Sequence, residues 1–114
     1  MPKKRTLVAA SVTPLMLSLL AQGETYGYDL IKRIAKVSSG KIRWTPSTLY
    51  PVLHRLEAQG LIVSTWRTSD AGHERKYYRL TPKGERALEH EKQEWLDVHA
   101  VLVHLWNTPK LASG

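Results

Sequence analysis

The stretch Thr45–Ile62, T-P-S-T-L-Y-P-V-L-H-R-L-E-A-Q-G-L-I, predicts the helix around which the rest of the chain is arranged. Thr45 is expected as its N-cap, Pro46 as its first residue, and Gly60 as the stop after its last turn. A C-capping motif would then fold Leu61 back over that turn. The apolar residues recur at helical spacing and form one buried stripe, which consists of Leu49, Val52, Leu53 and Leu56.

The opposite face of this predicted helix is polar, aromatic and basic, and it has no carboxylate before Glu57. Such a face suits either the solvated side of an ordinary amphipathic helix or a helix that lies in the major groove of DNA. The stretch by itself leaves both interpretations open. At about 100° per residue, the face carries Ser47, Tyr50, Pro51, His54 and Arg55.

The charge of the chain favours a polyanionic partner. A length of 114 residues fits one domain with one appended element, and the formal net charge is +7 with a pI near 9.9. Residues 1–80 hold 13 Lys/Arg and 5 Asp/Glu, a balance of +8, whereas residues 81–114 hold 4 and 5, a balance of −1. The basic part therefore indicates that the partner is nucleic acid or an acidic membrane surface, and the last third is expected to have a different function.

The sequence also limits the compartment. There is no cysteine, which excludes a disulfide framework and a thiolate metal site. The longest apolar run, near Pro14–Ala21, is far shorter than a membrane span, and no small-residue cleavage site follows the basic first residues. We therefore expect a cytoplasmic protein that has no membrane partner.

Cap and breaker signals divide the part before the organising helix into two shorter helices. Thr13 and Pro14 resemble an N-cap followed by proline, and they predict a helix that runs to Gln22. A second helix is predicted over Thr25–Val37 and ends at the break Ser38–Gly40. Residues 41–44 are too short for a helix and are interpreted as a brief strand.

The period changes after Gly60 from helical to alternating. Residues 62–67 and 75–80 are predicted as two strands, joined by a polar, glycine-containing loop over 68–74. The order helix, helix, helix, hairpin is that of a winged helix-turn-helix. We therefore expect a mainly α fold with a small β-hairpin.

A long helix is predicted to follow, from the cap Thr81–Pro82 through Trp106. Its first turns are expected to pack on their own domain, and the rest to pair with a second copy, because a coiled-coil-like seam on a lone helix needs a partner. This predicts a DNA-binding domain over 1–80 and a dimerisation helix with a tail over 81–114. The seam consists of Leu88, Trp95, Val98, Leu102 and Leu105.

Catalytic and metal-binding constellations do not emerge from the sequence. It has no G-x-S-x-G frame, no G-x-x-x-x-G-K-[ST] loop and no G-x-G-x-x-G fingerprint. His90 and Glu94 lie one helical turn apart, and we interpret them as a solvated pair rather than as metal ligands. We expect no enzyme activity, no cofactor and no metal site.

DNA binding is instead favoured by several independent features. In a helix-turn-helix, the N-terminal end of the third helix meets the base edges, and in this chain it carries Ser47, Thr48 and Tyr50. His54 and Arg55 lie further along the helix and could reach backbone phosphates. The hairpin tip would add phosphate or minor-groove contacts from His73, Arg75 and Lys76. The predicted partner is double-stranded DNA.

Three motifs carry a family resemblance: L-M-L-S-L-L-A-Q-G-x-x-Y-G-Y-D-L at 15–30, the organising stretch at 45–62, and R-K-Y-Y-R-L-T-P-K-G at 75–84. Together they resemble the PadR family of bacterial transcriptional regulators. The resemblance implies a dimeric winged-helix repressor that binds an inverted-repeat operator and is often released by a ligand. Tyr26 stands where the family usually has histidine.

The single C-terminal helix is similar to that of the smaller PadR proteins, which include multidrug-sensing members. For those, the resemblance implies that Trp95 pairs with its dimer mate and contacts flat aromatic ligands, with an acidic residue one turn later, where this chain has His99. Trp95 could equally fill the dimer seam. Two alternatives to a DNA-binding regulator therefore stay open: a protein that senses or sequesters planar aromatic molecules in a tryptophan-lined dimer pore, and a winged-helix module that binds an acidic protein.

Overall fold

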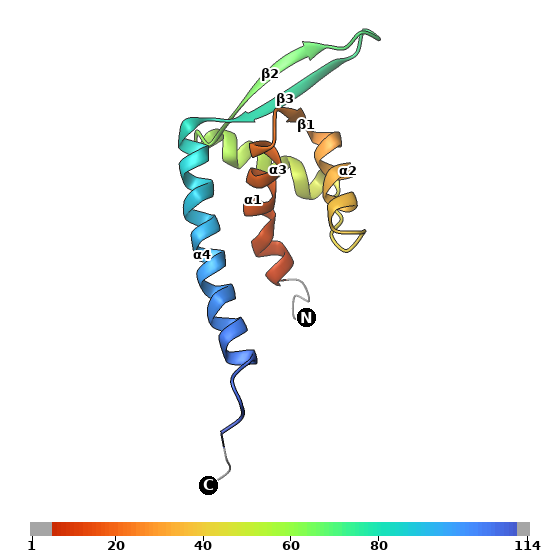
Figure 1. The fold of residues 1–114 in the computed structure, drawn as a ribbon. Coiled ribbons are helices and arrows are strands. Elements are labelled where there is room, and N and C mark those ends of the chain that lie inside the picture. Colours follow the sequence, from red (N-terminus) through yellow and green to blue (C-terminus); the bar gives the residue numbers. More distant parts are fainter. Residues whose placement is uncertain (1–5, 112–114) are drawn as a thin grey trace.

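The computed structural model describes residues 6–111 and has a small sheet, three short helices and one long helix that extends away from them (Figure 1). Residues 1–5, which include the basic first residues, and residues 112–114 of the predicted tail lie outside the described residues. The mainly helical class is confirmed, and the molecule is elongated, measuring 71 × 31 × 26 Å along its principal axes. The elements are α1 (Thr6–Ala21), β1 (Thr25–Tyr26), α2 (Gly27–Val37), α3 (Pro46–Ala58), β2 (Ile62–Thr68), β3 (Glu74–Leu80) and α4 (Pro82–Trp106).

Helix α1 corrects the first helix boundary. Thr13 and Pro14 do not form a cap, because one helix runs through both residues from Thr6. An interior proline removes one backbone hydrogen bond from a helix. Burial explains why the earlier turns still form: Val12 is buried together with Met16 one turn later, so the turn before Pro14 is held against the body.

Strand β1 corrects the start of the second helix. Thr25 and Tyr26 pair antiparallel with Tyr78 and Tyr77 of β3, so α2 begins only at Gly27. The predicted hairpin, β2 paired with β3, thereby becomes a three-stranded sheet with the order β1-β3-β2. Two extended residues suffice because β3 offers a free edge to them. The sheet thus ties the wing, defined here as residues 62–80, to the start of α2.

The connection between α2 and α3 is a turn rather than a strand. The Ser38 hydroxyl accepts from the Ile42 N–H at 2.9 Å, and Ser39 takes a left-handed conformation with φ 53°. Residues 41–44 have no strand partner, which corrects the prediction of a brief strand there. Instead, Trp44 is buried and anchors the chain immediately before α3.

Helix α3 has the predicted ends and the predicted buried stripe. Leu49, Leu53 and Leu56 are completely buried, and Val52 is half-buried against the same core. After the last turn, Gly60 adopts φ 76° and the Leu61 N–H donates to the Leu56 carbonyl at 3.0 Å, as a Schellman cap requires. The stripe therefore fixes which side of α3 faces away from the core.

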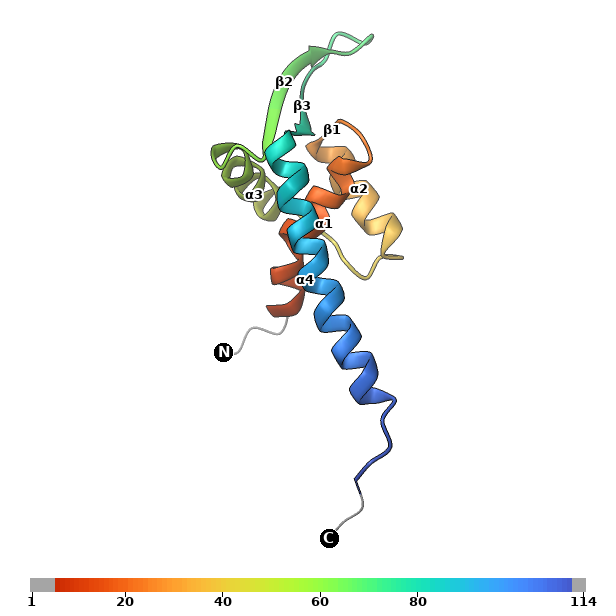
Figure 2. The same cartoon turned by 60° about the vertical axis from the view of Figure 1, so that its left-hand side comes forward.

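Helix α4 begins on the body and then leaves it. The Thr81 hydroxyl accepts from the Gly84 N–H at 3.0 Å and donates to the Gly60 carbonyl at 2.7 Å. Gly84 is buried so close to Leu61, the residue before β2, that a Cβ there would overlap the Leu61 carbonyl oxygen. Leu88 packs on the core, and α4 then runs beside α1 and past its N-terminal end (Figures 1 and 2).

Candidate nucleic-acid interface

The outer face of α3 is open to solvent. Ser47, Pro51, His54 and Arg55 are exposed, as the helical spacing predicts. Thr45 occupies the N-cap position, but its hydroxyl meets the Ser47 hydroxyl at 2.9 Å and makes no cap bond to a backbone N–H. The expected side-chain cap is therefore absent. Pro46 has no N–H and the Thr48 N–H donates to the Thr45 carbonyl at 3.0 Å, so the Ser47 N–H is the first-turn donor that faces outward for an acceptor such as a phosphate.

The start of α2 is similar, because Tyr26 at its N-cap position also makes no side-chain cap bond. Helix α4, in contrast, is capped by Thr81. In the helix-turn-helix, α2 and α3 thus both begin without a side-chain cap, whereas α4 has one. A helix N-terminus favours negative charge, since its backbone N–H groups and dipole point outward.

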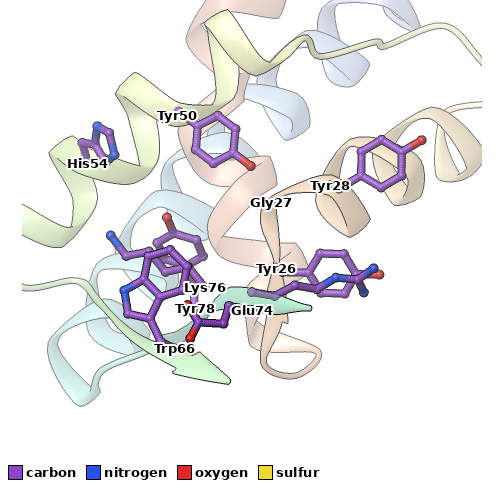
Figure 3. A pocket seen from close by; sticks show the side chains of 10 residues that line it. Tyr26, Gly27, Tyr28, Tyr50, His54, Trp66, Glu74, Lys76 and Tyr78 are labelled. Carbon is purple, nitrogen blue, oxygen red and sulfur yellow. The ribbon is translucent and has the colours of Figure 1, made fainter. Parts of the chain in front are cut away.

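A groove of about 550 Å³ joins α3, the start of α2 and the wing (Figure 3). We call it the wing groove. The Tyr50 ring lies across its helical side with the hydroxyl directed at Gly27, where a Cβ would be only 2.7 Å away. Tyr50, His54, Arg75 and Lys76, which were predicted from different segments, meet here. The lining residues are Tyr26, Gly27, Tyr28, Tyr50, His54, Trp66, Glu74, Arg75, Lys76 and Tyr78.

The wing cations lie near the loop of the wing, as expected, because Arg75 and Lys76 of β3 pair with Arg67 and Trp66 of β2. The Arg75 guanidinium lies 4.4 Å from the centre of the Tyr26 ring, a cation–π contact with β1. The Lys76 ammonium lies 3.7 Å from a Glu57 carboxylate oxygen and 5.6 Å from the centre of the Tyr78 ring. Both positive charges are therefore directed from the outer part of the wing toward β1 and α3.

Four of the predicted residues do not line the groove. Ser47 and Thr48 are exposed on the first turn of α3, and the other two are Arg55 and His73. The Arg55 guanidinium donates to the Thr13 hydroxyl at 2.7 Å, which turns this side chain toward α1. His73 is in the loop of the wing, where its N–H donates to the Ser69 hydroxyl at 3.1 Å and its carbonyl accepts from the Ser69 N–H at 2.7 Å. This loop fixes the shape of the tip.

Several aromatic residues of the wing groove were not singled out from the sequence. Trp66 is 64% exposed and lies on the same face of the sheet as Lys76, its partner across the strands. Tyr28, on the first turn of α2, is 62% exposed. The alternation of residues 62–67 did indicate the face of the strand on which Trp66 lies, because it placed this residue on the same side as Ile62 and Ser64.

Tyr78 forms the buried floor of this region. Burial raises the pKa of its hydroxyl above the usual 10.0, and the negative charge of Glu57 and an ionised Tyr50 act in the same direction. Its phenol therefore stays protonated over a wider pH range than that of a free tyrosine, and the wing groove gains no anion from it.

The far end of α4 carries a second unusual surface. Val98 and Leu105 are 58% and 60% exposed, and Val101, Leu102 and Trp106 are also exposed. Trp95 is 37% exposed and lies between two shallow hollows against α1, one of about 290 Å³ with Leu15 and Leu96, the other of about 360 Å³ with Leu7 and Val98. His99 lines neither of these hollows.

The described residues contain no cluster of three or more His, Cys, Asp or Glu side chains that could hold a metal ion. His90 and Glu94 form the predicted exposed i,i+4 pair, with 3.8 Å between the ring nitrogen and the carboxylate oxygen. Over residues 6–111, no helix combines the length and apolar character needed to cross a membrane.

Comparison with known proteins identifies the family of this chain. The family described as transcriptional regulator PadR-like matches residues 16–90, which include α2, α3, the wing and the start of α4. The chain belongs to the PadR family. PadR proteins are transcriptional regulators rather than enzymes, so the expectation that this chain is not an enzyme is confirmed.

Individual PadR proteins are similar to this chain in sequence and structure over most of its length. A transcriptional regulator of Mycobacterium tuberculosis, Rv3488, is 39% identical over 89 residues, which is 78% of this chain and 79% of that protein. The crystal structure of a PadR family regulator from Eggerthella lenta has a TM-score of 0.77 at 35% identity and covers 90% of this chain and 88% of that one. A PadR-like regulator from Bacillus cereus has a TM-score of 0.79 at 30% identity, covering 90% and 98%. The winged-helix architecture is thus shared with solved PadR proteins.

Proposed function

We propose that this PadR regulator is a sequence-specific DNA-binding repressor that acts as a homodimer on an inverted-repeat operator. The observation that carries the proposal is the wing groove, because it joins the exposed face of α3 to a basic wing in one concave surface. A recognition helix in the major groove with a wing beside it needs such a surface. Binding to DNA implies that the protein works in the cytoplasm of a bacterial cell.

Two groups of side chains would divide the contacts. Ser47, Thr48 and Tyr50, on the first turns of α3, would lie nearest the base edges, because that end of a recognition helix enters the major groove. The others would contact the sugar-phosphate backbone, which supplies much of the affinity without sequence information. These backbone contacts are assigned to His54, Arg55, His73, Arg75 and Lys76.

The dimer would be built from the last third of the chain. Residues 1–80 would bind DNA, and residues 81–114 would hold two copies together through Trp95, Val98, Leu102 and Leu105. Leu88 would contribute indirectly, because it packs on its own core. A two-fold dimer places two α3 helices about one DNA turn, or roughly 34 Å, apart, which fits an inverted repeat.

A gel-shift titration with the promoter region beside the protein's own gene tests DNA binding. We expect a specific complex at least about 1,000-fold tighter than the complex with random duplex at physiological salt. Tyr50→Ala and Arg75→Ala should weaken it, whereas Arg86→Ala, an exposed arginine of α4 outside the wing groove, should not. Equal affinity for operator and random duplex would overturn the sequence-specific proposal.

A second candidate function is the sensing of planar aromatic molecules. It is supported by Trp95, which borders two apolar hollows between α1 and α4, and a second copy of α4 would close these hollows further. Such a ligand would stack on the indole of Trp95, with His99 one turn away. Titration with a panel of planar aromatics should quench tryptophan fluorescence in the native chain and not in Trp95→Ala; quenching that persists in that variant would exclude this site.

A further inference from the structure

Glu57 is the carboxylate that interrupts the otherwise basic and polar face of α3, and the structure shows what it touches. Its side chain is turned toward the sheet and is about one third exposed. One carboxylate oxygen accepts from the Ser64 hydroxyl of β2 at 2.5 Å, and the other lies 3.7 Å from the Lys76 ammonium of β3. A single carboxylate at the last turns of α3 therefore holds both strands of the wing.

These two contacts are the polar side-chain links between α3 and the wing among the described residues. Toward the loop, the strands lose their cover, since Thr65, Trp66 and Arg67 of β2 are all exposed. The other face of the sheet is tied elsewhere: Arg75 stacks on Tyr26, and Arg67 pairs with Glu24. Glu57 is thus the outermost point at which the wing is fixed to the recognition helix.

The charge of Glu57 has a second effect. Glu57 does not itself line the wing groove, but it lies beside Lys76, which does, and offsets the positive charge of this lysine. A wing lysine that is paired with a carboxylate attracts DNA phosphates less strongly than an unpaired lysine does, whatever the base sequence. The reason is that opposite charges a few ångströms apart cancel at longer range. Non-specific affinity is largely electrostatic, so an anion at this place lowers it.

We propose that Glu57 is a positioning and specificity-determining residue: it sets the place of the wing relative to α3 and raises the ratio of specific to non-specific DNA affinity. The inference rests on the proposed function. A fixed wing strengthens binding to the operator, because the operator phosphates match one position of the wing. The negative charge of Glu57 weakens binding to random duplex. Both effects act on the same ratio.

Three variants separate geometry from charge. Glu57→Gln has nearly the same shape and keeps an oxygen that can accept from Ser64, but it loses the charge. Ser64→Ala removes one anchor and keeps the ion pair with Lys76, and Glu57→Ala removes both contacts. Glu89→Gln is the matched control, because it makes the same charge change at an exposed position on α4.

The measurements are affinities for operator and for random duplex over a range of salt, with hydroxyl-radical footprints of each complex. For Glu57→Gln we expect tighter random-duplex binding and a logarithmic salt dependence that is steeper by up to about 0.9, the contribution of one freed cation. For Glu57→Ala the affinity ratio should fall by about tenfold or more, with loss of the wing-side protection and retention of the protection by α3. Ser64→Ala should lose part of the same protection.

Circular dichroism and thermal melting of each free variant show whether it is folded. If Glu57→Ala does not fold, Glu57→Gln and Ser64→Ala carry the test. Ratios, salt dependence and footprints equal to those of Glu89→Gln would overturn the inference while leaving the proposed function intact. If the unmodified protein itself does not distinguish operator from random duplex, the proposed function fails, and the inference fails with it.

Discussion

The two halves of α4 belong to one continuous helix, yet their surroundings are opposite. The proximal half, residues 82–94, is capped by Thr81, contacts Leu61 through Gly84 and packs Leu88 on the core. In the distal half, residues 95–106, Val98, Leu102 and Leu105 continue the apolar pattern in the open. Helical periodicity is the same in both halves, but the apolar row of the distal half borders its own chain only near its start, where Trp95 lies against α1. An exposed apolar row of this length indicates a partner.

The largest expected effect comes from breaking the proximal half at Gly84. In Gly84→Val the new side chain overlaps the Leu61 carbonyl oxygen, which belongs to the backbone and cannot rotate away. We expect the free energy of unfolding to fall by about 4 kcal/mol or more, at the upper end of single substitutions. Chemical denaturation measures it. Gly72→Ala, which has φ 83° but open space around it, is the control and should cost only about 1 kcal/mol.

The next effect falls on the distal half. Leu102→Asp puts a charge into the exposed apolar row and should raise the dimer dissociation constant by about 30-fold or more, since interface hot spots contribute about 2 kcal/mol or more. Sedimentation equilibrium measures it. Ala100→Asp, on another side of the same helix, should leave association unchanged. If the unmodified chain is monomeric at micromolar concentration, the distal half has a different partner and the homodimer proposal fails.

A smaller effect distinguishes the two ends of the helix. Thr81→Ala removes the N-cap bond to the Gly84 N–H, together with the bond to the Gly60 carbonyl, and should lower stability by about 1 kcal/mol. Thr108 donates to the His104 carbonyl at the exposed far end, so Thr108→Ala should change stability by less than about 0.5 kcal/mol. Thermal unfolding of both variants tests the difference, and equal shifts in melting temperature would contradict it.

The smallest effect needs a change of pH. Tyr78 has a raised pKa in the folded state, because burial and then the charges of Glu57 and Tyr50 disfavour its ionised form. The folded protein therefore holds this proton more strongly than the unfolded chain. The resulting stability is complete below about pH 10 and is lost as the pH rises from there through the folded-state pKa. The difference in unfolding free energy between the native chain and Tyr78→Phe should change only in this alkaline range. A difference that varies between pH 6 and 9 would contradict the assignment.

Local signals in the sequence were sufficient where one segment determines its own structure. The stop at Gly60, the cap at Thr81 and the two wing strands follow from turn chemistry and periodicity, and the structure has them. The boundaries at Pro14 and Thr25 were wrong because distant contacts decide them. Burial of Val12 carries α1 through the proline, and the free edge of β3 turns Thr25 and Tyr26 into a strand.

The same distinction applies to the candidate site. The exposed face of α3 follows from helical spacing alone. The wing groove does not, because it depends on how segments far apart in the sequence approach one another, as Tyr26 does with Arg75 and Glu57 with Lys76. Spacing also cannot show that Arg55 turns to Thr13 instead of outward. Residue types could be assigned to a nucleic-acid surface, but their contacts required the fold.

The closeness of Tyr50 to Gly27 limits how this sequence can diverge. A Cβ at residue 27 would lie 2.7 Å from the Tyr50 hydroxyl oxygen and 3.1 Å from a methyl carbon of Leu49. Any larger residue at 27 must therefore displace the ring that lies over the start of α2, whereas a small residue at 50 would remove one reason for glycine. The two positions are 23 residues apart in the chain, but they are not free to change independently. A larger residue at 27 is compatible with the fold only if residue 50 has already become smaller.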